Sequence, residues 1–87
     1  MAMKKYLAGL RLLRIDRKLS QLALASLLGV SEQTISRYEN QLRFPREKFV
    51  RSTCEVLDCE FWELHHPNPI RAKRLIALAE ALERAAS

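Results

Sequence analysis

Residues 20–40, SQLALASLLGVSEQTISRYEN, predict two short helices joined by a tight turn. Ser20 is a favourable N-cap for the first helix, because its hydroxyl accepts a hydrogen bond from an exposed amide. Leu24 and Leu28 then recur at helical spacing on one face. Gly29 is expected to end this helix, since glycine readily adopts the left-handed backbone that is common at helix C-termini.

The second helix of this pair is predicted to have an apolar inner face and a polar outer face. Val30 is expected to fill the angle between the two helices, and Ser31 to cap the second one. Ile35 and Tyr38, or Glu39, share its inner side. The opposite side carries hydrogen-bonding side chains, namely Glu32, Gln33, Ser36 and Arg37.

This pattern resembles the motif of the lambda-repressor and Cro-like helix-turn-helix family, also called the XRE family. The matching segments are Leu19-Ser20-Gln21, Leu24-Ala25, Leu28-Gly29-Val30-Ser31, Thr34-Ile35-Ser36 and Tyr38-Glu39-Asn40. The resemblance extends over roughly residues 7–64, well beyond a bare helix-turn-helix pattern. It departs at Lys18 and Gln41, where the family often has glycine, so a left-handed or turn backbone is expected there.

The resemblance implies an all-α fold, a five-helix lambda-repressor-like DNA-binding domain over residues 1–66. Residues 67–87 would form an additional C-terminal amphipathic helix. It also implies a transcription regulator of phage or bacterial type, a repressor that binds a pseudo-palindromic operator in double-stranded DNA as a homodimer. A salt bridge between Arg14 and Glu39, which would hold the reading helix at its angle, is likewise implied by the resemblance.

If DNA is the ligand, the polar residues of the motif divide into two groups. Gln33 and Arg37 are the predicted base readers, because glutamine pairs with adenine and arginine with guanine in the major groove. Residues expected to contact phosphates are Gln21 and Ser31 at helix starts, and Arg43 and Arg46 after the second helix. Further candidates for base contact are Glu32, Thr34 and Ser36.

Charge and composition are compatible with this prediction. The 87 residues suffice for one small domain, and the formal charge is +5. Residues 1–51 hold eleven Lys or Arg and four Asp or Glu, a net +7, whereas residues 52–87 carry a net −2. The basic half is therefore the half that contains the motif, as expected for a surface that faces phosphates.

The remaining sequence predicts four further helices and a linker. A first helix is expected from about residue 4 to 17, and Pro45 is expected to open a helix with Val50, Cys54 and Leu57 inside. A short fifth helix would close the core with Phe61, Trp62 and Leu64. Residues 65–69 form a stiff linker, and residues 70–86 are helical again.

The C-terminal helix carries a stripe of Leu75, Leu78 or Ala79, and Leu82, which must bury against another surface. Four apolar residues stand where the family more often has polar ones: Leu12, Ile15, Leu22 and Leu27. Periodicity predicts that the stripe is buried, but it does not identify the surface that would cover it. Docking within the chain, dimerisation and a groove on a partner protein therefore remain open.

Metal binding and catalysis are not expected. The usual zinc patterns have a spacing unlike that of Cys54, Cys59, His65 and His66. The two cysteines are instead expected in the core. The sequence has no nucleophile with an adjacent base and no paired carboxylates, so we expect neither an enzyme nor a cofactor. It has no bilayer-spanning apolar run and no signal peptide, so a cytoplasmic protein with reduced thiols is expected.

Two functions from different classes remain. The leading hypothesis is the transcription regulator described above. The alternative is an antitoxin-type protein-binding module, which would neutralise a toxin through the C-terminal helix and regulate its own operon through the helix-turn-helix. A neighbouring toxin gene would distinguish them.

Overall fold

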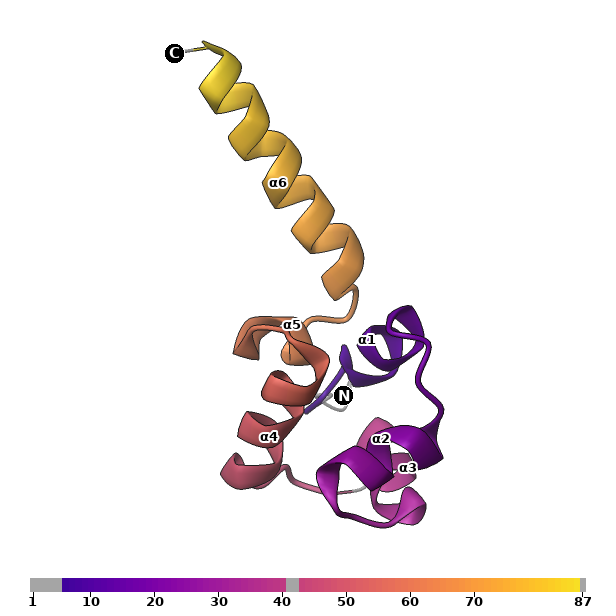
Figure 1. The fold of residues 1–87 in the computed structure, drawn as a ribbon. Coiled ribbons are helices and arrows are strands. Elements are labelled where there is room, and N and C mark those ends of the chain that lie inside the picture. Colours follow the sequence, from indigo (N-terminus) through magenta and orange to yellow (C-terminus); the bar gives the residue numbers. More distant parts are fainter. Residues whose placement is uncertain (1–5, 41–42, 87) are drawn as a thin grey trace.

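The computed structural model describes residues 6–40 and 43–86. All regular secondary structure in this part of the chain is α-helix. The helices are α1 (Leu10–Asp16), α2 (Gln21–Leu28), α3 (Glu32–Glu39), α4 (Glu47–Leu57), α5 (Phe61–His65) and α6 (Pro69–Ala86). Helices α1 to α5 form the body, and α6 projects away from it (Figure 1). The predicted all-α fold, with five helices and one more at the C-terminus, is confirmed.

A single cluster of buried side chains holds α1 to α5 together. Leu10 and Leu13 of α1 meet Leu24 of α2 and Ile35 of α3, each with no exposed surface. The other members are Leu7, Ala25, Tyr38, Phe49, Val50, Leu57 and Leu64. This burial removes apolar surface from water and is the main favourable contribution to the fold.

Helix α1 is shorter than predicted, beginning at Leu10 instead of near residue 4, and residues 1–5 lie outside the described part of the chain. The reason lies at Gly9. Its amide donates a 2.8 Å hydrogen bond to the carbonyl of Leu64, so the backbone of α5 lies directly against it. A Cβ on Gly9 would stand 2.1 Å from the carbonyl oxygen of Glu63. Residues 6–9 therefore form turns that bring the chain against α5.

Helix α4 begins at Glu47, so the prediction that Pro45 opens it is wrong. Arg46 is the extended N-cap residue, and Glu47 places a negative charge in the first turn, where the helix dipole favours it. Val50 is buried as predicted, but Cys54 is only half-buried. Thr53 is fully buried instead, and its hydroxyl donates a 2.7 Å hydrogen bond to the carbonyl of Phe49.

Helix α5 buries a charged residue where aromatic packing was predicted. Phe61 is 64% exposed and Trp62 half-buried, whereas Glu63 is 2% exposed. Glu63 and Glu60 form a capping box, in which the Glu63 carboxylate accepts a 3.2 Å bond from the Glu60 amide. The ammonium of Lys73 lies 3.6 Å from the same carboxylate. These partners turn Glu63 inward and leave Phe61 outside.

Two residues with side chains adopt the left-handed backbone. Lys18 has φ 58°. A left-handed backbone was predicted here, because the family that the sequence resembles often has glycine at this position. Asp58 has φ 48° and ends α4, where Arg17 donates a 2.9 Å bond to the carbonyl of Leu57. The second departure, Gln41, lies outside the described residues.

Candidate nucleic-acid interface

Helices α2 and α3 form a helix-turn-helix whose caps are those that the sequence predicts. The Ser20 hydroxyl accepts a 2.9 Å bond from the amide of Ala23, and the Ser31 hydroxyl a 3.1 Å bond from that of Thr34. Gly29 ends α2 with φ 69°. The turn is thus determined by local side-chain and backbone chemistry.

The inner face of α3 fixes this helix against the body. Ile35 is fully buried, and Tyr38 is 3% exposed. The Tyr38 ring stacks on Phe49 of α4, with the ring centroids 4.0 Å apart. Val30, in the turn before α3, packs against the same core. The position of α3 is therefore set by apolar contacts that leave its other face free.

The outer face of α3 presents three exposed polar side chains, Glu32, Gln33 and Arg37. Thr34 and Ser36 are half-buried and engaged locally. Thr34 shares a 2.8 Å bond with the Ser31 hydroxyl, and Asn40 donates a 3.3 Å bond to Ser36. The structure thus places all five predicted base readers on one short helix, with Glu32, Gln33 and Arg37 more accessible than Thr34 and Ser36.

Arg14 and Glu39 form a buried, two-point ion pair between α1 and α3. Nε of Arg14 lies 2.5 Å from Oε2 of Glu39, and Nη2 lies 3.0 Å from Oε1. Nη1 donates a 2.8 Å bond to the carbonyl of Leu19, which ties in the segment before α2. The hydrogen bond to Glu39 and its charge raise the pKa of Arg14 against the effect of burial. Through these contacts Arg14 links α1 both to α3 and to the segment before α2.

Gln21 lies beside this ion pair. Its Nε2 donates a 3.1 Å hydrogen bond to Oε1 of Glu39, and the residue is half-buried. The sequence suggested a phosphate contact for this side chain. In the structure its donor nitrogen is directed to Glu39, so Gln21 also supports the orientation of α3.

The two arginines after α3 are exposed. The guanidinium of Arg43 lies 6.0 Å from the centroid of the Tyr38 ring, within the range of a cation–π contact. Arg46 is the N-cap residue of α4. Tyr38 of α3 therefore helps to position the Arg43 guanidinium, whose charge stays accessible to solvent.

Comparison with known proteins agrees with this architecture. A family described as helix-turn-helix domain matches residues 8–60, which is more than half of the chain. The chain belongs to this family. The matched range contains α1 to α4 and thus the complete helix-turn-helix with its Arg14–Glu39 support.

A solved structure supports the fold beyond the helix-turn-helix domain. It is the crystal structure of the clp gene regulator ClgR from Corynebacterium glutamicum, with a TM-score of 0.67 and 22% identity. The likeness covers 97% of this chain and 90% of that chain, so it extends into α6. No curated protein matches the chain.

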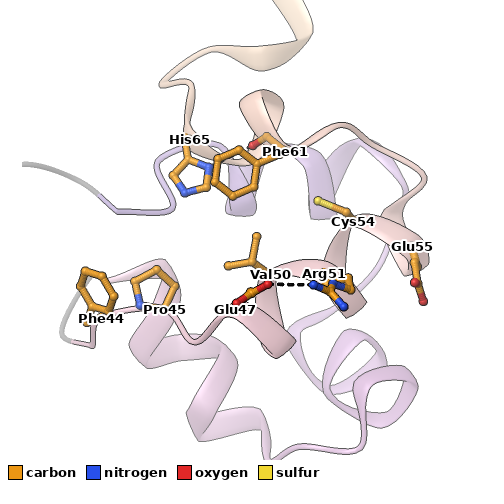
Figure 2. Close-up of a pocket in the computed structure, with 9 residues that line it drawn as sticks. All are labelled: Phe44, Pro45, Glu47, Val50, Arg51, Cys54, Glu55, Phe61 and His65. Atoms are coloured by element: carbon orange, nitrogen blue, oxygen red, sulfur yellow. Dashed lines mark hydrogen bonds and ion pairs between the residues drawn. The ribbon is translucent and has the colours of Figure 1, made fainter.

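Outside the helix-turn-helix, the structure contains an apolar groove that the sequence did not indicate (Figure 2). It has a volume of about 680 Å³ and lies between α4, α5 and the segment before α4. Phe61 and Val50 project into it from the two helices, with Phe44 at one end. Phe44 is 71% exposed and meets the ring of Tyr6 edge-on at 5.0 Å. The groove depends on the placement of α4 against α5, so the sequence alone does not indicate it.

Cys54 lines this groove, and the amide of Cys59 donates a 3.0 Å hydrogen bond to the carbonyl of Cys54. Both are free thiols and half-buried, which is less than the core position that was predicted. Burial raises the pKa of Cys59 to about 12, and burial also raises the pKa of Cys54. Both thiols are consequently poor nucleophiles at neutral pH, since the thiolate is the reactive form.

Among residues 6–40 and 43–86, no three His, Cys, Asp or Glu side chains gather as metal ligands would. None of the described helices is long and apolar enough to cross a membrane.

Proposed function

We propose that this protein is a sequence-specific DNA-binding transcription regulator that places α3 in the major groove. The observation that carries the proposal is the polar outer face of α3, supported from behind by Ile35, Tyr38 and the Arg14–Glu39 pair. A rigid helix with an exposed polar face can contact base edges without rearrangement. Helix-turn-helix domains of this family are generally not enzymes, and the proposal requires no cofactor.

Gln33 and Arg37 read the sequence in this proposal. They are four residues apart, so they lie one turn apart on the same side of α3. Both side chains are exposed and long enough to reach base edges. A glutamine amide pairs with N6 and N7 of adenine, and a guanidinium with O6 and N7 of guanine. Glu32, Thr34 and Ser36 add contacts at the edge of this surface.

Phosphate contacts fix the position of α3 on the duplex. Arg43 and Arg46 supply exposed charges after α3, and Ser31 lies exposed at its N-terminus. Gln21 lies at the start of α2, where amides of the first turn are directed outward. Such contacts are insensitive to base sequence and depend strongly on salt.

The proposed target is a pseudo-palindromic operator bound by a homodimer. One recognition helix covers only a few base pairs, so a pair of helices in successive major grooves, about 34 Å apart, is needed for a specific site. We further propose that binding represses transcription in the cytoplasm. Footprinting on DNA upstream of the protein's own gene would identify the operator.

The exposed leucines of α6 favour one second candidate, an antitoxin. Leu75, Leu78 and Leu82 are each more than half exposed, as a surface for a toxin would be. Co-expression with the product of a neighbouring gene tests this candidate. A stable complex through α6 and relief of that product's toxicity would support it.

The base-reading role is tested by comparing three variants. Arg37→Ala and Gln33→Ala should each reduce discrimination between operator and unrelated DNA by about 1–3 kcal/mol, because each removes a base contact. Arg43→Ala should weaken binding to all DNA alike and make the logarithmic salt dependence shallower by about one unit. Competition binding at several salt concentrations measures both effects.

Circular dichroism provides the control, since Gln33, Arg37 and Arg43 are all exposed and their loss should leave the fold intact. Unchanged operator preference after replacement of both Gln33 and Arg37 would show that α3 is not the reader. The antitoxin candidate would then account better for the molecule.

A further inference from the structure

Helix α6 extends from the body with little contact to it (Figure 1). Pro69 is buried, and Ile70 and Ala72 are half-buried, but residues 73–86 are all exposed. Leu75, Leu78 and Leu82 are 55%, 56% and 63% exposed. The exposed part is 14 residues long. An isolated helix of that length is marginal in water, so its stability depends on packing of its apolar side.

The apolar residues of α6 have the spacing of a two-helix seam. Leu75, Leu78 and Leu82 follow one another at intervals of three and four residues, and Arg71 and Ala85 continue the series at either end. The positions beside the seam are mostly alanine, namely Ala72, Ala79, Ala81 and Ala86. Small residues beside a leucine seam allow a second helix to approach closely.

This stripe faces away from the protein's own body. The crevice between α1 and α6 is lined on the α6 side by Ile70, Lys73, Arg74 and Ala77. At 100° per residue, the centre of that lining side lies about 120° around the helix from the centre of the leucine stripe. The apolar residues Leu12, Ile15, Leu22 and Leu27 are exposed and are not covered by α6. Docking within the chain, one of the alternatives left open by the sequence, is therefore not what the structure shows.

We propose that α6 pairs with α6 of a second copy of this chain, in antiparallel orientation, along the Leu75–Leu78–Leu82 stripe. A two-fold axis would bring the same stripe from each copy into contact, as in most dimers. The exposed surface of the leucines and flanking alanines on two helices is on the order of 1,000 Å², near the lower limit for a specific interface. The dimer is expected to be weak in solution. Because α3 and the C-terminal end of α6 lie at opposite ends of the molecule, this pair holds the two α3 helices far apart and is distinct from the arrangement on the operator (Figure 1).

The charges of α6 select the antiparallel orientation. Its first turns carry Arg71, Lys73 and Arg74, and its later turns carry Glu80, Glu83 and Arg84, giving +3 and −1. In a parallel pair, Arg71 would face its counterpart on the seam. In an antiparallel pair, Arg71 and Arg74 lie near the C-terminal end of the partner helix, whose carbonyl dipoles favour cations.

The dimer is tested without DNA, so that failure of this inference is distinct from failure of the proposed DNA binding. Sedimentation equilibrium of the full chain should show a monomer–dimer equilibrium. Leu78→Glu should weaken dimerisation about tenfold or more, because it places a charge in the seam. Ile76→Glu is the matched control, since Ile76 is 49% exposed on the same helix but lies about 120° from the centre of the stripe.

A second control separates α6 from the apolar groove. Phe61→Ser removes an exposed groove side chain and should leave the dimer unchanged. A monomeric full chain at all accessible concentrations, equal effects of Leu78→Glu and Ile76→Glu, or loss of the dimer in Phe61→Ser would each overturn the proposal.

Orientation is tested by distances between orthogonal spin labels at positions 73 and 84 on the polar side of α6. Introduction of the labels as noncanonical amino acids leaves Cys54 and Cys59 untouched. The antiparallel pair predicts that the distance from position 73 of one copy to position 84 of the other is shorter than both same-position distances. In a parallel pair the mixed distance is the longest, because 11 residues of helix span about 16 Å. That result would overturn the orientation.

Discussion

At the scale of single residues, the two glycines have different roles. Gly29 has a left-handed backbone, and a Cβ on it would meet no atom within 4 Å. Gly9 has an ordinary φ of −91°, but the carbonyls of Glu63 and His66 and the ring of Pro69 surround the position that its Cβ would occupy. Gly29 therefore serves backbone conformation, whereas Gly9 allows close approach of α5 and α6.

Gly9→Ala should be the more damaging of two matched glycine substitutions. The backbone carbonyls of Glu63 and His66 cannot move without displacing the α5–α6 junction, so we expect a loss of about 3 kcal/mol in the free energy of unfolding. Gly29→Ala should cost only about 1 kcal/mol, from the strain of the left-handed backbone. Urea denaturation measures both. Equal losses would mean that Gly9 is not closely packed.

Cys59 should be protected from alkylation by its environment. Burial raises its pKa from 9.0 to about 12. A smaller fraction of the Cys59 thiol is therefore ionised near pH 7. We expect alkylation in the folded protein to be about 100-fold slower or more than in the denatured chain. Mass spectrometry after timed treatment with iodoacetamide measures this ratio. Similar rates in both states would contradict the effect of burial.

At the scale of the elements, the ion pair of Arg14 and Glu39 sets the angle between α1 and α3. The two side chains are 10% and 4% exposed. The surface pair of Arg51 and Glu47, on α4, has side chains 72% and 86% exposed. Buried charges depend on their partner much more than solvated ones do, so the two pairs should respond differently to removal of the acid.

Glu39→Ala should destabilise the protein by about 3–5 kcal/mol, because it leaves the Arg14 charge buried without its partner. It also removes the acceptor of the Gln21 amide, so DNA binding should fall for operator and unrelated DNA alike. Glu47→Ala is the control and should cost less than about 1 kcal/mol. Chemical denaturation and DNA titration measure these effects. Comparable losses in the two variants would show that the α1–α3 pair is not structurally important.

At the scale of the whole molecule, the parts that stabilise the fold differ from the part proposed to form the dimer. The core lies among α1 to α5, and none of its members comes from residues 73–86. The apolar side of α6 instead faces solvent in the single chain. The body and the α6 stripe should therefore be separable by truncation.

Removal of residues 75–87 should leave the unfolding free energy of the monomer unchanged within about 0.5 kcal/mol, since these residues make no core contact. The same truncation should abolish dimerisation of the free chain, because it removes Leu75, Leu78 and Leu82. Removal of residues 86–87 alone retains the stripe and is the control. A large loss of monomer stability would mean that α6 packs on the body in solution.

The sequence by itself determined the parts of this protein whose physics is local. Ser20, Gly29 and Ser31 fix the ends of α2 and α3 through hydrogen bonds and backbone freedom within a few residues. The spacing of Ile35 and Tyr38 fixes which face of α3 is buried. The all-α fold and the helix-turn-helix could be predicted from such signals, and the candidate base readers on α3 followed from its outward face.

Only the tertiary structure decided the features that depend on residues distant in the chain. The late start of α1 follows from the approach of Glu63 to Gly9, the burial of Glu63 from its capping box and Lys73, and the groove from the placement of α4 against α5. The direction of the α6 stripe also depends on how α6 leaves the body. Periodicity shows which residues share a side of a helix, but the surface that this side meets is set by the packing of the whole chain.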